Sequence, residues 1–237
     1  MKQLKNWDSN TWLSTSQYIN KFINFLSKVA PLSKNTAILD IGCGRGTIIA
    51  KLADRFAFIQ RPIGIDIVKH QSRSKKIKLI KANALKYLRS SKQKFDLILI
   101  KQSIHFFNLK EVRQLILYAK KILNKNGRIV IFSLNTKVNE WPKFKSFTGN
   151  LEKSLKKDEK IIKLLKSIFK TFKTNQFIYN VHLDKKYYLK MLKNRFTSCL
   201  LNFSNKELSE GIEEVDHDFK NKINFKDRLI CLTFTNK

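Results

Sequence analysis

The stretch Ile38-Leu39-Asp40-Ile41-Gly42-Cys43-Gly44-Arg45-Gly46-Thr47 decides the fold of this chain. Its apolar start suits a strand that is buried on both faces. Three glycines follow: Gly42 allows a sharp turn after the strand, Gly44 lets a ligand approach the backbone, and Gly46 allows close packing where the next helix begins. The pattern predicts a strand, a glycine loop and a helix whose first backbone N–H groups face a ligand.

Strand-like and helix-like segments alternate after this loop. Apolar runs predict further strands over residues 63–67, 77–80, 95–100 and 128–132. Helical spacing predicts helices over residues 48–58, through 85–88 and over 109–123, the last of them stopped by Asn126-Gly127. Strands and helices that alternate at these lengths predict an α/β fold, with an open parallel sheet covered by helices on both faces.

The two flanks of this core have patterns of their own. Before it, helical spacing predicts a helix over residues 10–30, capped by Ser9 or Asn10 and stopped by Pro31. After it, the patterns predict helices over residues 151–172, 187–195 and 206–219, and strands over 176–181 and 228–234. We therefore expect a single domain over residues 1–237, with a helical lid over 1–35, a ligand-binding core over 36–135, and substrate-side helices with the last two strands over 136–237.

Composition limits the cellular setting. No apolar run reaches the ~18 residues of a spanning helix, and no apolar signal region follows the N-terminus, so we expect neither a membrane span nor export. The three cysteines, Cys43, Cys199 and Cys231, are too far apart for a metal clip or a disulfide framework. This spacing indicates a reducing compartment, and we expect the cytoplasm.

The charge is strongly positive and unevenly spread. Lys and Arg number 48 against 18 Asp and Glu, a net charge of +30. Such a balance fits a nucleic-acid surface, but the excess lies in Lys rather than in the Arg that base recognition favours. Because Asn and Ile are abundant too, a compositional bias is the favoured explanation. The basic helix over 151–172 either covers the core, as we expect, or lies on an anionic membrane.

Acidic residues crowd one short stretch near the C-terminus. They are Glu207, Glu210, Glu213, Glu214, Asp216 and Asp218. The favoured interpretation is an acidic helix face that offsets nearby lysines. The alternative is a local site for a cationic or amine-bearing substrate.

Polar residues near the glycine loop, at the ends of the predicted strands, indicate a nucleoside ligand. Asp66 ends the second predicted strand, where a carboxylate accepts hydrogen bonds from both ribose hydroxyls of an adenosine group. Asn83 follows the third strand, where its amide reaches an adenine edge. Asp40 would repel a pyrophosphate but suits the ammonium of a methionine group. The spacing Gly-x-Gly-x-Gly and this carboxylate favour S-adenosylmethionine over a dinucleotide.

These residues resemble the class I S-adenosylmethionine-dependent methyltransferases over about residues 36–135. The stretch 38–46 is similar to their first motif, and Gly64-Ile65-Asp66 to their ribose-binding strand end. Residues 95–107 resemble their fourth strand and loop, and residues 123–131 their turn into the fifth strand, although Lys125-Asn126-Gly127 replaces Pro-Gly-Gly. The resemblance implies a Rossmann-like, doubly wound, mostly parallel seven-stranded sheet whose last strand, near 228–234, is antiparallel. The N-terminal helix and the C-terminal helices would be additions to it.

The resemblance also implies which residues bind. The expected cofactor-binding set is Asp40, Gly42, Cys43, Gly44, Gly46, Asp66, Ile67, Asn83, Ala84 and Lys101. Asn83 stands where many relatives carry Asp. His105 is the candidate general base, or else a positioning group, and no metal is expected. Trp12 and Tyr18, on the first helix, either cover the cofactor or the substrate or pack in the core. The position of Arg195 after the core makes it a further candidate at the acceptor pocket.

The expected reaction is methyl transfer from S-adenosylmethionine to a small molecule, at oxygen, nitrogen or a carboxylate. The loop after the fourth strand is similar to that of the small-molecule branch. It reads Lys101-Gln102-Ser103-Ile104 and lacks the Pro-Pro signature of enzymes that methylate base amines. Two alternatives stay open: an RNA methyltransferase that uses the Lys-rich surface, and a binding protein that keeps the fold without turnover.

Overall fold

A computed structural model describes residues 9–70, 74–169 and 171–236. Its strands form one seven-stranded sheet in the order β3-β2-β1-β4-β5-β7-β6. The strands are β1 (Ile38–Ile41), β2 (Ile63–Asp66), β3 (Lys78–Lys81), β4 (Phe95–Lys101), β5 (Leu123–Leu134), β6 (Phe172–Asp184) and β7 (Lys222–Thr235). Strands β1 to β5 pair in parallel, and β7 is antiparallel to both β5 and β6. The predicted mostly parallel sheet with an antiparallel last strand is confirmed.

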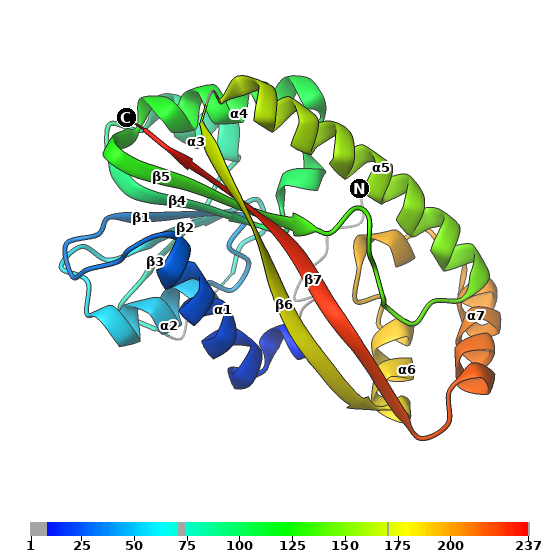
Figure 1. The fold of residues 1–237 in the computed structure, drawn as a ribbon. Helices are drawn as coiled ribbons and strands as arrows, with labels where there is room; N and C mark the ends of the chain where they lie inside the picture. Colours follow the sequence, from blue (N-terminus) through cyan, green and yellow to red (C-terminus); the bar gives the residue numbers. More distant parts are fainter. Residues whose placement is uncertain (1–8, 71–73, 170, 237) are drawn as a thin grey trace.

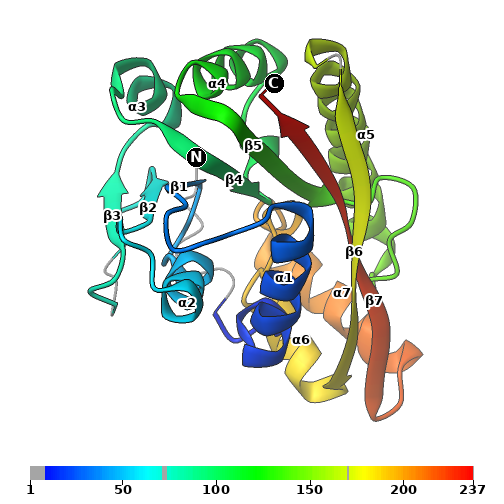
Figure 2. The ribbon, with the colours of Figure 1, turned by 60° about the vertical axis from the view of Figure 1, so that its left-hand side comes forward.

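Helices cover both faces of the sheet (Figure 1). On one face lie α1 (Ser16–Val29) and α2 (Thr47–Phe56). On the other lie α3 (Ala84–Ser90), α4 (Leu109–Lys121) and α5 (Lys145–Ile168). Strands β6 and β7 extend well beyond the rest of the sheet, and α6 (Lys185–Lys193) and α7 (Asn205–Asp218) lie beside this extension. Figure 2 shows α1 against the same pair of long strands.

The strand order locates the ligand crevice. Strand β1 lies between β2 and β4, so the chain leaves β1 toward one edge of the sheet and later returns on its other side. A crevice opens where the connections diverge, at the carboxyl ends of the parallel strands. The glycine loop follows β1 directly and therefore lines this crevice.

The N-terminal helix begins later than predicted. A short 3-10 helix, η1 (Trp12–Ser14), comes first, and its cap is Thr11, which accepts from the Leu13 N–H. Thr15 then adopts an extended conformation and caps α1 by accepting from the Tyr18 N–H. The prediction of Ser9 or Asn10 as the cap was wrong because Asn10 has φ +59° and the extended Thr15 separates the two helices.

The predicted stop signal after α4 serves another purpose. Helix α4 ends at Lys121, and Asn126-Gly127 lies inside β5, where the register with β4 shifts. The Asn126 N–H donates to the Asn236 carbonyl (2.7 Å), and the Asn236 N–H donates to the Gly127 carbonyl (2.9 Å). The turn at Asn126-Gly127, which the sequence pattern assigned to a helix end, therefore pairs with the C-terminal segment instead.

The basic amphipathic helix covers the core. It spans Lys145–Ile168 rather than 151–172, and Phe172 begins β6 instead. Its apolar side, including Ile161 and Leu165, is buried against α4 and β5, which confirms the covering role. Among the described residues, no helix is long and apolar enough to cross a membrane.

The acidic stretch is occupied by contacts within the protein. Glu207 forms a capping box with Ser204 at the start of α7. The Glu214 carboxylate accepts from the Lys145 N–H (2.9 Å) at the start of α5. Asp216 pairs with Lys185 at 2.6 Å. The pair of Asp216 and Lys185 agrees with the interpretation that the acidic face offsets nearby lysines, whereas Glu207 and Glu214 bind backbone N–H groups at helix starts.

Candidate active site

The turn after β1 depends on a close approach to the end of β4. Gly42 has φ +73°, and a Cβ there would lie 2.4 Å from the Ser103 Cβ. The Ser103 hydroxyl donates to the Ile41 carbonyl (2.8 Å), which ties the two strand ends together. Only glycine satisfies both the backbone conformation and this packing.

The middle of the loop is open and its end is packed. A Cβ built on Gly44 would meet no atom within 4 Å, so a ligand has free access to the backbone there. Gly46 precedes the first residue of α2, and a Cβ on it would lie 2.8 Å from side-chain atoms of Ile77 and Leu79. Both observations match the roles that the glycine spacing predicts.

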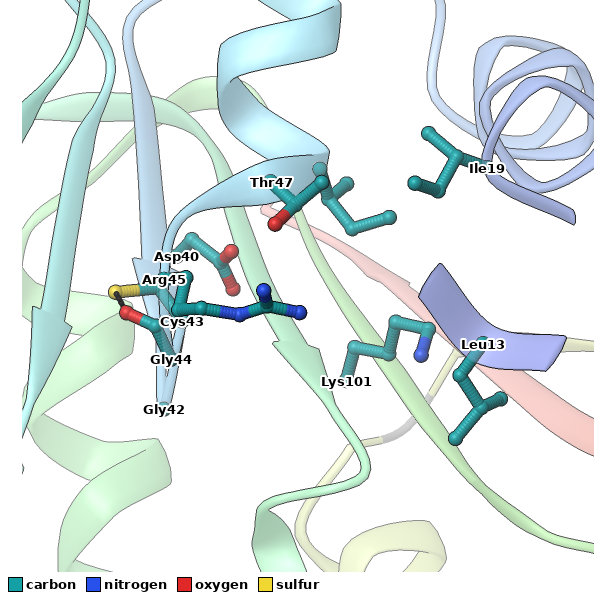
Figure 3. A pocket seen from close by; sticks show the side chains of 10 residues that line it. Leu13, Ile19, Asp40, Gly42, Cys43, Gly44, Arg45, Thr47 and Lys101 are labelled. Carbon is teal, nitrogen blue, oxygen red and sulfur yellow. Dashed lines mark hydrogen bonds between the residues drawn. The ribbon is translucent and has the colours of Figure 1, made fainter. Parts of the chain in front are cut away.

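A hollow lies between this loop and the N-terminal segment (Figure 3). The space between its walls is about 590 Å³, part of which is open to solvent. Its lining residues are Leu13, Ile19, Asp40, Gly42, Cys43, Gly44, Arg45, Thr47, Ile48 and Lys101. Strand ends, glycine loop and helix start therefore meet in one concave site, as expected for a nucleoside-bearing ligand.

The Asp40 carboxylate is the buried charge of this hollow. Its side chain is 4% exposed, and within the described residues no hydrogen-bond donor contacts it. Burial raises the pKa of Asp40 to about 7, helped by the charge of Asp66 and opposed by that of Lys101. A buried carboxylate without a donor is costly, and a cationic group in the hollow would relieve this cost.

Lys101 faces the hollow from the end of β4 (Figure 3). Its ammonium donates to Gln102 Oε1 (2.9 Å) and lies 5.3 Å from the ring centroids of both Tyr18 and Phe22. The aromatic pair of α1 therefore holds the lysine by cation–π contact. The hollow thus has an acidic group at the end of β1 and a basic one at the end of β4.

Asp66 joins the end of β2 to the glycine loop. Its Oδ2 accepts from the Gly44 N–H and its Oδ1 from the Val68 N–H, both at 2.9 Å. A carboxylate offers about four lone-pair positions, so capacity for two ribose hydroxyls remains. The following Ile67 is 61% exposed and presents an apolar surface beside the carboxylate.

Asn83 caps a helix, a role that the sequence analysis overlooked. Its Oδ1 accepts from the Lys86 N–H (3.1 Å) and so caps α3, which begins at Ala84. Asparagine just before a helical segment is itself a cap signal, so this role was recognisable. The second lone pair of the oxygen stays available to an adenine amino group.

Trp12 and Tyr18 lie in the core, whereas residues next to each of them line the hollow. Trp12 is 1% exposed, and its indole N–H donates to Asp227 Oδ2 (3.1 Å). Tyr18 is fully buried, which raises the pKa of its hydroxyl. Of the N-terminal residues from position 9 onward, Leu13 and Ile19 reach the hollow. The buried Trp12 and Tyr18 anchor this segment in the core.

His105 and Arg195 lie outside the lining of this hollow. His105 is half-buried in the 3-10 helix η2 (Ile104–Phe106) after β4, and burial lowers its pKa to about 4. The Arg195 guanidinium donates to the Phe203 carbonyl (2.7 Å) and to Asn205 Oδ1 (3.2 Å). The arginine thus belongs to the connection between α6 and α7.

Sequence reasoning missed Arg45 as a lining residue. Figure 3 shows its guanidinium pointing from the glycine loop across the hollow. The signal was its position between Gly44 and Gly46, which places it at the ligand whatever its type. Thr47 and Ile48 line the hollow because they begin α2 at the same point.

Cys43 packs against β2. A Cβ built on Gly64 would lie only 2.6 Å from the Cys43 Sγ. Burial raises the pKa of the thiol. No group of three or more His, Cys, Asp or Glu side chains able to hold a metal occurs among residues 9–70, 74–169 and 171–236.

The chain matches a known family over this region. A profile described as a methyltransferase domain matches residues 32–195. The chain belongs to this methyltransferase family. It is an S-adenosylmethionine-dependent enzyme, and the residues at this edge of the sheet fit that cofactor. The Asp40 carboxylate is buried and receives no hydrogen bond from the described residues, the Gly44 backbone is open to a ligand, and the Asp66 carboxylate keeps unused lone pairs.

Solved structures share the fold of the methyltransferase. A putative methyltransferase from an antibiotic biosynthesis pathway of Anabaena variabilis has a TM-score of 0.67 at 14% identity, over 90% of this chain and 96% of that one. A putative methyltransferase from Bacillus halodurans has a TM-score of 0.56 at 14% identity, over 90% and 98%. The N-methyltransferase NodS of Bradyrhizobium japonicum, in complex with S-adenosylhomocysteine, has a TM-score of 0.50 at 16% identity, over 96% and 92%. A search of curated proteins found no match.

Proposed function

We propose that this methyltransferase acts on a small-molecule acceptor in the cytoplasm and binds its cofactor in the hollow of Asp40. The observation that carries the proposed cofactor site is the buried Asp40 carboxylate, which faces an open glycine loop and has no donor within the described residues. The ammonium of the methionyl group would supply that donor. Arg45 and Lys101 line the same hollow and would hold its carboxylate.

The rest of the cofactor follows the strand ends. Asp66 would accept from the ribose hydroxyls and keep its two bonds to backbone N–H groups. Asn83 would accept from the adenine amino group, and Ile67 would cover the ring. Cys43, Gly42, Gly46 and Ala84 shape the backbone around these contacts.

When bound, S-adenosylmethionine supplies a methyl group that its sulfonium already activates. The chain therefore contributes position and exclusion of water. Leu13 and Ile19 line the hollow with apolar side chains and would exclude water from the bound cofactor. Burial lowers the pKa of His105 to about 4, so its ring is neutral at physiological pH but is a weak base. This favours the role of a positioning group, which would accept a hydrogen bond from the acceptor, over that of a general base. Trp12, Tyr18 and Arg195 would act on the acceptor indirectly, by holding the surrounding elements.

Two variants test the cofactor site. Calorimetric titration with S-adenosylhomocysteine should show binding to the wild type and a loss of at least tenfold in Gly44→Val, which fills the open backbone, and in Asp66→Ala. Ser90→Ala, on the exposed end of α3, is the control. Unchanged affinity in both site variants would refute the site.

Transfer is tested with a small-molecule filtrate of a cell extract and methyl-labelled cofactor, followed by mass analysis of the labelled product. Label in a small molecule supports the proposal.

A second candidate acceptor, RNA, is favoured by one observation. Helix α5 exposes a row of lysines, namely Lys153, Lys156, Lys157, Lys160, Lys163 and Lys166. It requires labelled RNA and an affinity that falls steeply with salt. A flat salt response would remove it.

A further inference from the structure

A buried polar cluster lies on the α5 side of the sheet, outside the lining of the cofactor hollow. Its centre is Asp158, in the middle of α5, which is 3% exposed. One carboxylate oxygen, Oδ2, accepts from the Ser133 hydroxyl (3.1 Å). The other, Oδ1, is buried and has no hydrogen-bond partner in the part of the chain that the structure describes. Native proteins rarely leave such an atom unpaired unless a water or ligand completes it.

The surroundings of this oxygen are polar rather than apolar. The Cys199 thiol lies close enough for the charge of Asp158 to raise its pKa, although burial is the larger cause. The polar side chains of Ser154, Thr197 and Ser198 lie near the same thiol and oppose this rise in its pKa. Helix α5 and the 3-10 helix η3 (Ser198–Leu200) thus build a group of small polar side chains around one carboxylate.

The cluster lies at the carboxyl edge of the sheet, where the acceptor has to approach. Ser133 directly follows Phe132, whose register partner in β4 is Lys101, a lining residue of the hollow. Neighbouring strands are about 4.8 Å apart and a strand rises about 3.3 Å per residue, so Ser133 and Lys101 are close along the edge. Lys157, next to Asp158, donates from Nζ to the His105 carbonyl (2.7 Å), which joins α5 to the loop after β4.

We propose that Asp158 recognises the acceptor, and that its Oδ1 accepts a hydrogen bond from an amino group, so that the acceptor is an amine-bearing small molecule. This inference rests on the proposed function. Burial raises the pKa of Asp158 to about 6, so the group is charged at neutral pH. A charged carboxylate forms its strongest hydrogen bonds with charged N–H donors. The hydroxyls of Ser133 and Thr197 provide further polar contacts for the same ligand.

The wild-type enzyme alone gives the first test. The full chain is incubated with methyl-labelled S-adenosylmethionine and a small-molecule filtrate of a cell extract, and the labelled product is applied to a cation exchanger at neutral pH. We expect retention, because the acceptor carries an amine. A labelled product that passes through unretained would overturn the inference. No transfer, or no binding of S-adenosylhomocysteine, would instead refute the proposed function, and the inference would fall with it.

Asp158→Asn gives the second test, because it keeps the shape and removes the charge. At limiting acceptor, the initial rate should fall roughly 10- to 100-fold, while the calorimetric Kd for S-adenosylhomocysteine stays within twofold. Asp96→Asn is the matched control: the two oxygens of Asp96 already accept, from the Ala37 N–H (2.8 Å) and Asn124 Nδ2 (2.7 Å), at the other end of β4. Its rate should stay within twofold. Wild-type rates in Asp158→Asn would mean that Oδ1 holds a buried water only and would overturn the inference.

Discussion

Replacing Asp40 by asparagine should stabilise the fold and weaken cofactor binding together. In the folded chain, burial raises the pKa of Asp40 from 3.8 to about 7. The folded state therefore binds more protons than the unfolded state between these values, and stability falls as the pH rises through this window. The shift of about 3 units corresponds, at 1.36 kcal/mol per unit, to about 4 kcal/mol above pH 7. Asparagine has no charge and avoids this cost.

Chemical denaturation of the ligand-free protein at pH 4 and pH 8 measures this effect. At pH 8, Asp40→Asn should raise the free energy of unfolding by at most about 4 kcal/mol, and at pH 4 the gain should nearly vanish. Asp96→Asn should lose stability, since both of its oxygens accept hydrogen bonds. A destabilised Asp40→Asn at pH 8 would contradict the reasoning.

Cofactor affinity should follow the same titration. Only the ionised Asp40 attracts an ammonium, and with a pKa of about 7 the carboxyl is roughly nine-tenths protonated at pH 6. The Kd of the wild type for S-adenosylhomocysteine should thus be about tenfold higher at pH 6 than at pH 8. Asp40→Asn should bind weakly at both. Equal wild-type affinities at the two pH values would refute the assignment of Asp40 to the ammonium.

Two further substitutions test how the hollow is built. Gly42→Ala should lower the free energy of unfolding by about 2 kcal/mol or more, because φ is +73° and the new Cβ would meet Ser103 at 2.4 Å; an unchanged melting temperature would argue against this turn. Trp12→Phe and Trp141→Phe each remove an indole N–H that donates to Asp227, at 3.1 and 3.4 Å. Only Trp12 is in the segment that covers the hollow. Trp12→Phe should therefore raise the Kd for S-adenosylhomocysteine severalfold and Trp141→Phe should not, at a similar loss of stability. Equal changes of the Kd in the two variants would contradict a covering role of this segment.

Local patterns were enough for the core of this fold. The strands of the core, the glycine loop and the carboxylates at positions 40 and 66 were predicted, because a buried parallel strand and a nucleoside-binding turn are written in consecutive residues. The boundaries were less accurate. Lys121 rather than Leu123 ends α4, and Asn126 turns inside a strand, because pairing with Asn236 determines its conformation.

The sequence by itself determined the parallel sheet, the cofactor loop and the family, since each depends on residues that are neighbours along the chain. Only the tertiary structure decided which N-terminal residues reach the hollow and where the buried carboxylates find partners. Trp12 and Asp227 are 215 positions apart, and Ser133 contacts Asp158 across two elements. Such contacts depend on how helices settle on the sheet, and their energies come from burial and long-range hydrogen bonds that leave no periodic pattern in the sequence.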